Sequence, residues 1–247
     1  MKSYLLSLME IILFSLFFYV CYYSIEYFSF DKRKLSYFQR VINTKYLTII
    51  NLYILTLYFG LSIFAVFLHN KCIQSVRSSV LSVTMALGWF VTLTFWGLYF
   101  YNRELVYPKS VDKLIPKWWN YAAHLFNVVA ITSEAIINKP KTRTTKLSLY
   151  LILILIIGYV TLIEYHIRMK NFYVYPIFKM LPELYRYLFN AGLIVAFVGI
   201  HYVSDYFVNR LVAGATQKLK SAKSNPAIPR SNQSASGSTN RRKIRKD

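Results

Sequence analysis

Charged residues are scarce in this sequence, at 16% of its 247 residues, whereas a soluble globular domain carries roughly 25%. Hydrophobic residues make up 55% of the chain and aromatic residues 18%. This composition excludes an ordinary soluble domain. Long apolar runs with few charges indicate instead a protein that crosses a membrane several times.

Acidic residues are scarcer still, since 10 Asp and Glu stand against 30 Lys and Arg and leave a net charge of +20. A strongly basic chain is a candidate for nucleic-acid binding. Here, however, the positive charge lies in loops and in a C-terminal tail, between the apolar segments. We therefore expect no nucleic-acid partner, and we expect membrane lipids as the partners of the chain.

The residue patterns of several common sites are missing. The two cysteines, Cys21 and Cys72, make no disulfide framework, and there is no Cys-x-x-Cys or Cys/His cluster for a metal. No two histidines lie within five residues of each other, which excludes the histidine boxes of membrane desaturases. With only 8 glycines, the chain has no G-x-S-x-G and no glycine-rich phosphate loop. We expect no metal and no cofactor.

Six apolar runs are long enough to span a bilayer as helices, which takes about 20 residues each. They cover residues 4–24, 47–68, 80–101, 118–137, 147–166 and 185–208. The first run is too long for a signal peptide and has no small-x-small cleavage site after it, so we interpret it as a retained anchor. The sequence thus predicts an all-α polytopic membrane protein, with a six-helix domain over residues 1–212 and a disordered basic tail over residues 213–247.

An even number of spans places both termini on one side of the membrane. The basic tail favours the cytosol for that side, whereas the loops of the opposite side carry more Lys and Arg than the loops of the terminal side. We favour cytosolic termini. The basic end of the tail, Lys243 to Lys246, is similar to a dibasic retrieval signal and predicts the endoplasmic reticulum, although a basic tail could equally lie on anionic lipid.

Polar residues recur on one face of two predicted helices. On the fourth they lie at i, i+4, i+7 and i+14, and on the second at i, i+3 and i+14. These residues are Asn120, His124, Asn127 and Glu134 on the fourth helix, and Thr48, Asn51 and Ser62 on the second. Such groups are costly in a bilayer and mark functional sites. The alternative is that they only join helices by hydrogen bonds.

Thr48 and His124 are predicted to meet. The second and fourth helices start on the same side of the membrane, and their depths at these residues differ by roughly 8 Å at 1.5 Å per residue. A hydroxyl beside an imidazole can be an activated nucleophile. Glu134 lies about 15 Å along the axis from His124, too far to orient its ring. The orienting group stays open among Asn120, Asp112, Glu164 and His166.

Several segments resemble the androgen-induced membrane protein family, over about residues 40–210. Residues 45–48 (KYLT) and 58–60 (YFG) are similar to its second helix, and residues 95–109 (FWGLYFYNRELVYPK) to its third helix and following loop. The start of its fourth helix is matched by Asp112, Ile115-Pro116, Trp118-Trp119-Asn120, His124 and Glu134, and the loop before its sixth helix by residues 173–176 (YVYP).

The resemblance implies an activity and its residues. The family includes threonine hydrolases that cleave fatty acid esters of hydroxy fatty acids. The resemblance therefore implies that Thr48 is the nucleophile and His124 its base, and that they act on a lipid substrate within the bilayer.

Four further residues are candidates for supporting roles. Asn51, Asn120 or backbone N–H groups could stabilise an oxyanion. Arg103, with Lys109, could bind a lipid carboxylate or phosphate, or could be an interfacial anchor flanked by tyrosines. Glu134 is included because it matches the family pattern.

Two other functions stay open. One is a non-catalytic membrane scaffold or interaction protein of the endoplasmic reticulum, in which the polar faces only hold helices together. The other is a transporter or channel that uses Glu10, Glu134 and Asp205 as a polar path.

Overall fold

The computed structural model describes residues 2–27, 45–68 and 70–224. Five long helices are each apolar enough to cross a membrane. They are α1 (Lys2–Tyr27), α3 (Leu47–Phe67), α4 (Lys71–Asn102), α7 (Lys146–Lys170) and α9 (Glu183–Ser224). The described residues contain no strand, so the predicted all-α class is confirmed.

The fourth predicted span is a composite helix. It consists of α5 (Lys117–Tyr121), the π-helical turn η3 (Ala122–Phe126) and α6 (Asn127–Asn138), which follow one another without a break. Because η3 divides the run, none of the three pieces is long enough to span a bilayer alone. The polar residues on one face of this span, Asn120, His124, Asn127 and Glu134, are distributed over all three pieces.

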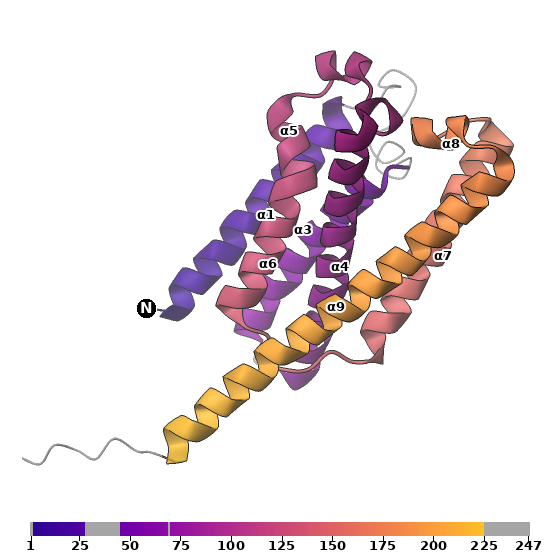
Figure 1. Cartoon of the computed structure of the whole chain (residues 1–247). Helices are drawn as coiled ribbons and strands as arrows, with labels where there is room; N and C mark the ends of the chain where they lie inside the picture. The colour runs from indigo at the N-terminus through magenta and orange to yellow at the C-terminus, as the bar shows by residue number, and fades with distance from the viewer. Residues whose placement is uncertain (1, 28–44, 69, 225–247) are drawn as a thin grey trace, which may run out of the picture.

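Short elements gather at the end of the bundle opposite the N-terminus, which we call the loop end; the other is the terminal end (Figure 1). The loop end holds η1 (Arg103–Leu105), η2 (Lys109–Lys113) and α8 (Pro176–Met180). Pro116 precedes α5 and Pro176 opens α8, in keeping with the fixed φ of proline at helix starts. The loop end is also where α3 and α5 begin.

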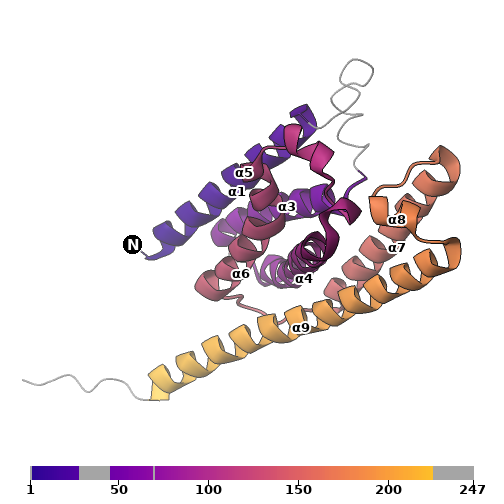
Figure 2. The same ribbon diagram turned by 45° about the horizontal axis from the view of Figure 1, so that its top comes forward.

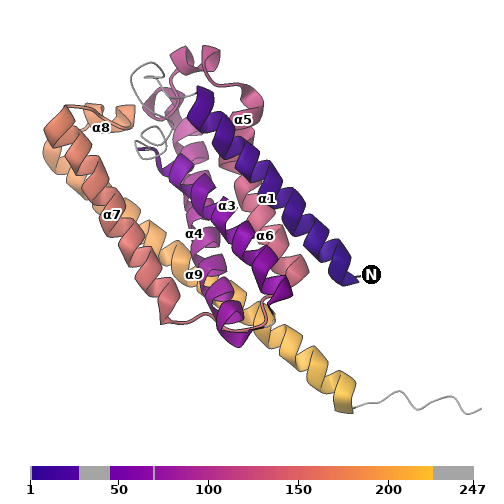
Figure 3. The ribbon, with the colours of Figure 1, turned by 180° about the vertical axis from the view of Figure 1, so that it is seen from behind.

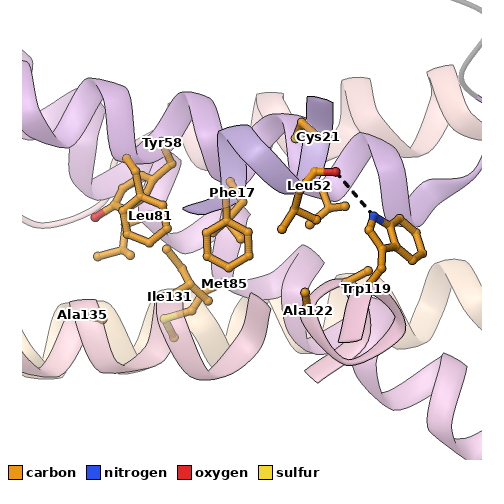
Figure 4. Packing of buried hydrophobic residues seen from close by; sticks show 14 of the residues in the cluster. Phe17, Cys21, Leu52, Tyr58, Leu81, Met85, Trp119, Ala122, Ile131 and Ala135 are labelled. Carbon is orange, nitrogen blue, oxygen red and sulfur yellow. Dashed lines mark hydrogen bonds between the residues drawn. The ribbon is translucent and has the colours of Figure 1, made fainter. Parts of the chain in front are cut away.

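The helices form two groups that share α4. In Figures 1 and 3, α1, α3, α4 and the α5–α6 run lie together, while α7 and α9 form a pair that lies side by side near the loop end, after which α9 continues past α4. Figure 2 shows α4 between the two groups. One apolar cluster, with Phe17, Leu52 and Met85, fills the first group (Figure 4). A second, with Phe90, Ile152 and Phe197, joins α4 to the pair.

The outward faces of the helices are apolar. Leu57, Ile154 and Val195 are 72%, 67% and 72% exposed. Large apolar surfaces of this kind are not left to water. They are suited to contact with lipid tails.

A buried charge cluster ties four helical segments at the terminal end. Arg77 of α4 forms ion pairs with Glu134 of α6 and with Glu10 of α1, the latter at 3.5 Å. From α3, Tyr58 donates to Glu134 at 2.7 Å and Ser62 donates to Glu10 at 2.8 Å. Two of the acids considered for a transport path are therefore engaged with Arg77.

α4 begins at Lys71, earlier than residue 80, the start expected from the sequence, because its start is capped and its first turns carry buried polar side chains. Asn70 caps the helix by accepting from the Cys72 N–H at 2.7 Å, and capping fixes a helix start. The first turns are polar yet buried, with Gln74 and Arg77 only 6% and 4% exposed. Arg77 therefore lies within a helix and not in the loop before it.

The last helix is longer than expected. α9 continues to Ser224, past the domain boundary predicted after residue 212. Residues 213–220 include Ala, Gln, Lys and Leu, which have high helix propensity, and the first proline after α9 is Pro226. The rest of the predicted tail, with the basic motif at Lys243 to Lys246, lies outside the described residues.

Candidate active site

Thr48 and His124 are in direct contact. Thr48 is the second residue of α3, and its Oγ1 lies 3.1 Å from His124 Nε2. His124 is in η3 and is 5% exposed. The two side chains, 76 residues apart in the sequence, meet near the loop end because both helical runs start there.

The other ring nitrogen of His124 fixes its tautomer. Nδ1 lies 3.0 Å from the backbone carbonyl oxygen of Asn120. Because a carbonyl only accepts, Nδ1 carries the hydrogen, and in the neutral ring Nε2 is then a bare acceptor facing the Thr48 hydroxyl. Asn120 therefore orients the imidazole through its backbone, not through its side chain.

His124 lies in the π-helical turn η3. Single π turns inside α-helices occur frequently at functional sites. The contact of the ring with the carbonyl four residues earlier does not depend on this turn, because His166 Nδ1 lies 2.8 Å from the Leu162 carbonyl oxygen within the regular helix α7.

Aromatic side chains hold the imidazole from two sides. The Phe95 ring stacks on His124 with 3.6 Å between centroids and 16° between planes. The indole of Trp96 donates to the His124 carbonyl at 3.0 Å. Trp119 approaches the imidazole edge-on at 6.2 Å, and its own N–H bonds to Ser24 at 2.9 Å. A base held in one rotamer by its surroundings is pre-organised for proton transfer.

A large cavity opens beside the Thr48–His124 pair. Its volume is about 1030 Å³, at the upper end of the roughly 300–1,000 Å³ of small-molecule pockets. The wall is mostly apolar and comes from α3, α4, α7, α9 and the loop end. It lies between the two helix groups, and its apolar wall suits an acyl chain.

The ionisable Lys and His side chains that line the cavity are not balanced by any acidic side chain. Besides His124 the lining contains Lys45, His166 and Lys170, and no Asp or Glu is among the lining residues. Lys170 is exposed, which places this part of the lining at the opening. The Lys45 ammonium lies 3.9 Å above the Phe172 ring, and burial lowers the pKa of Lys45.

Two tyrosines meet at the first residue of α3. The Leu47 N–H lies 3.1 Å from the hydroxyl oxygens of both Tyr159 and Tyr175. The two hydroxyls are 3.2 Å apart, and Tyr159 also donates to the Lys45 carbonyl at 3.3 Å. Both rings line the cavity that holds Thr48.

The remaining predicted site residues do not contact the pair. Asn51 is buried one turn after Thr48, and neither of its amide atoms has a hydrogen-bond partner among the described residues. Arg103 pairs with Asp112 at 2.6 Å and donates to the Tyr107 carbonyl at 3.2 Å, which braces the loop after α4. Glu134 belongs to the charge cluster at the terminal end.

Sequence reasoning assigned no role to four residues around the site. Phe95, Tyr175 and Lys45 lie within the segments that resemble the family, so the resemblance could have marked them as candidate site residues. Tyr159 lies in an aliphatic run outside these segments, and nothing in the sequence indicated a role for it.

Across the described ranges, no three His, Cys, Asp or Glu side chains gather in one place, so no metal-binding set can be named.

Comparison with known proteins places this site in a family. The chain is similar to the androgen-dependent TFPI-regulating protein of Mus musculus, with 30% identity over 79% of this chain and 88% of the relative. The Homo sapiens protein of that name is 32% identical over 57% and 64%. The androgen-induced gene 1 protein of Homo sapiens is 24% identical over 64% and 66%. No solved structure matches the chain. The match to the family described as FAR-17a/AIG1-like protein spans residues 7–209, and the chain therefore belongs to that family of membrane proteins.

Proposed function

We propose that this protein is an integral-membrane lipid ester hydrolase in which Thr48 is the nucleophile and His124 the general base. The observation that carries the proposal is the 3.1 Å contact between Thr48 Oγ1 and His124 Nε2 in the wall of the cavity. A nucleophile, a base within hydrogen-bond reach and a group that orients the base are the three parts such chemistry requires.

The reaction follows from these positions. His124 Nε2 takes the Thr48 proton while Oγ1 bonds to the ester carbonyl carbon, whose π electrons move to the oxygen. As the tetrahedral intermediate collapses, the bond to the leaving alcohol breaks and the imidazolium protonates that alcohol. Water, deprotonated by His124, then attacks the acyl-threonine, and the acid leaves as Thr48 regains its proton. The Asn120 carbonyl stabilises the imidazolium formed in each half.

The cavity supports fatty acid esters of hydroxy fatty acids as the substrate class. Such a lipid has two apolar chains, an internal ester and one free carboxylate. The apolar walls suit the chains. The basic residues Lys45, His166 and Lys170, with no acid in the lining, would attract the carboxylate to the opening.

The proposal includes a location, which rests on the basic end of the sequence and its similarity to a dibasic retrieval signal. We propose that the chain resides in the endoplasmic reticulum membrane with both termini in the cytosol. Because Thr48 and the cavity opening lie at the loop end, the site would then face the lumenal leaflet.

Hydrolysis by purified variants tests the proposal. Thr48→Ala and His124→Ala are expected to lose activity on a fatty acid ester of a hydroxy fatty acid by at least about 100-fold, the lower range for general base catalysis. Thr161→Ala, an exposed threonine on α7, is the control and keeps the wild-type rate. Variants of unchanged melting temperature that still hydrolyse at the wild-type rate contradict the proposal.

The same variants test the scaffold function. If Thr48 and His124 only join helices, their removal leaves a buried polar partner unpaired, at a cost of about 1–3 kcal/mol. The melting temperature would then fall and the wild-type protein would show no hydrolysis.

A further inference from the structure

We propose that the Tyr175 hydroxyl, backed by Tyr159, donates the hydrogen bond that stabilises the oxyanion formed when Thr48 attacks the ester. The inference rests on the proposed hydrolase function and adds a catalytic residue to it. Of the asparagines considered for this role, neither Asn51 nor Asn120 belongs to the lining of the cavity, whereas Tyr175 does.

Tyr175 contacts the residue that precedes the proposed nucleophile. The Tyr175 hydroxyl lies 3.1 Å from the Leu47 N–H, and the next residue is Thr48. Tyr175 and Thr48 both line the cavity. A carbonyl carbon bonded to Thr48 Oγ1 is therefore attached to the residue that follows the backbone N–H in contact with the phenol.

The hydroxyl of Tyr175 can have a free hydrogen to donate. A phenol oxygen has two lone pairs and one hydrogen. Tyr175 can accept from the Leu47 N–H at 3.1 Å and from the Tyr159 O–H at 3.2 Å, which fills both acceptor positions. The Tyr175 hydrogen then has no acceptor among the described residues and is available to an oxyanion.

The cluster can switch to this arrangement at little cost. The Tyr159 hydrogen has two acceptors within reach, Tyr175 Oη and the Lys45 carbonyl at 3.3 Å. Without substrate it can bond to Lys45 while Tyr175 donates to Tyr159. When an oxyanion forms, both hydroxyls rotate, and each hydrogen bond accepted by Tyr175 strengthens its own O–H as a donor.

Tyr175 is held in place by its neighbours and keeps its hydrogen. Tyr175 stands between buried Val174 and Pro176, the first residue of α8, and its ring meets Tyr46 edge-on at 6.0 Å. A donor held in place before the reaction needs no reorganisation during it. Burial raises the pKa of Tyr175, so the phenol keeps its hydrogen at neutral and mildly alkaline pH. No proton is transferred; the phenol only donates a hydrogen bond.

The test compares three tyrosine-to-phenylalanine variants of the full chain in lipid nanodiscs. For Tyr175→Phe we expect a fall in kcat of about 100-fold, the size seen when one oxyanion donor is removed, with KM and melting temperature unchanged. The rate of labelling by a fluorophosphonate probe falls with kcat, because its phosphoryl oxygen occupies the same place. Tyr150→Phe, on the exposed face of α7, is the matched control.

The outcomes separate this inference from the proposed function. If wild-type protein hydrolyses the ester and Tyr175→Phe does so at the rate of Tyr150→Phe, the oxyanion role is wrong and the hydrolase function stands. If Tyr175→Phe does not fold, Tyr159→Phe is the deciding variant. Its kcat is expected to be about tenfold lower than that of the wild type, and a kcat equal to that of Tyr150→Phe would overturn the oxyanion role. A wild-type protein that neither hydrolyses nor reacts defeats the proposed function itself.

Discussion

At the scale of single residues, the site consists of a threonine that opens one helix and a histidine on a π turn of another. Periodicity and depth along two helices were enough to predict that Thr48 and His124 could meet, because both features depend only on helix geometry. The group that orients the ring could not be chosen from the sequence. It is a backbone carbonyl, at Asn120, and side-chain identity carries no information about backbone groups.

Lys45 provides a test of substrate recognition. Replacing it by Ala removes a cation from the cavity opening, so KM for an ester with a free carboxylate is expected to rise about tenfold, a coupling of the size of a charge-assisted hydrogen bond. KM for the same lipid as its methyl ester should not change. Steady-state kinetics with both substrates makes the comparison, and Lys113→Ala, at an exposed lysine of η2 outside the cavity, is the control.

A pH dependence follows from the same lysine. Because burial lowers the pKa of Lys45, its ammonium loses its proton at a lower pH than an ordinary lysine does. KM for the carboxylate substrate should therefore rise as pH rises toward that lowered pKa, and the rise should vanish in Lys45→Ala. An identical alkaline profile in that variant would rule out Lys45 as the group that titrates.

At the scale of secondary structure, most boundaries could be predicted, and the exceptions have physical causes. The fifth span is nearly pure aliphatic sequence and was located within a few residues. The third was placed too late because Gln74 and Arg77 look like loop residues when their buried partners on other helices are unknown. The π turn in the fourth was not predicted, since its sequence, Ala122–Phe126, is compatible with an ordinary α-helix.

Arg77 is expected to hold the helices of the first group together. Arg77→Ala leaves Glu10 and Glu134 buried without their cation, which costs about 3–5 kcal/mol for a buried ion pair broken on one side. Thermal unfolding in detergent should show a large loss of stability, whereas Arg143→Ala, at an exposed loop position, should behave as wild type. Equal melting temperatures for the two variants would show that the cluster is not structural.

At the scale of the whole molecule, one helix group carries Thr48 and His124, and the α7–α9 pair closes the cavity beside them. That division could not be predicted, because helix order and hydropathy do not state which spans pack together. Six spans did predict that the termini share one side, and the positions of α1 and α9 agree with this (Figure 1). The basic tail favours the cytosol for that side, whereas the larger number of Lys and Arg residues in the loops of the opposite side favours the lumen.

The native cysteines allow a direct test of orientation. Cys72 is exposed at the terminal end and Cys21 is buried. With cytosolic termini, a membrane-impermeant maleimide should label Cys72 in sealed vesicles of endoplasmic reticulum with the cytosolic face outward. Cys72→Ser should abolish the signal, and Lys109→Cys in that background should react only after permeabilisation. The reverse pattern would place the termini in the lumen.

The central claim is that Thr48 is a nucleophile activated by His124. The most direct measurement is covalent labelling of purified protein by a fluorophosphonate probe, with peptide mass spectrometry to locate the adduct. We expect the adduct on Thr48 in the wild type and none in Thr48→Ala or His124→Ala proteins that melt as the wild type does. An adduct on another residue, or labelling of Thr48 that persists without His124, would contradict this account.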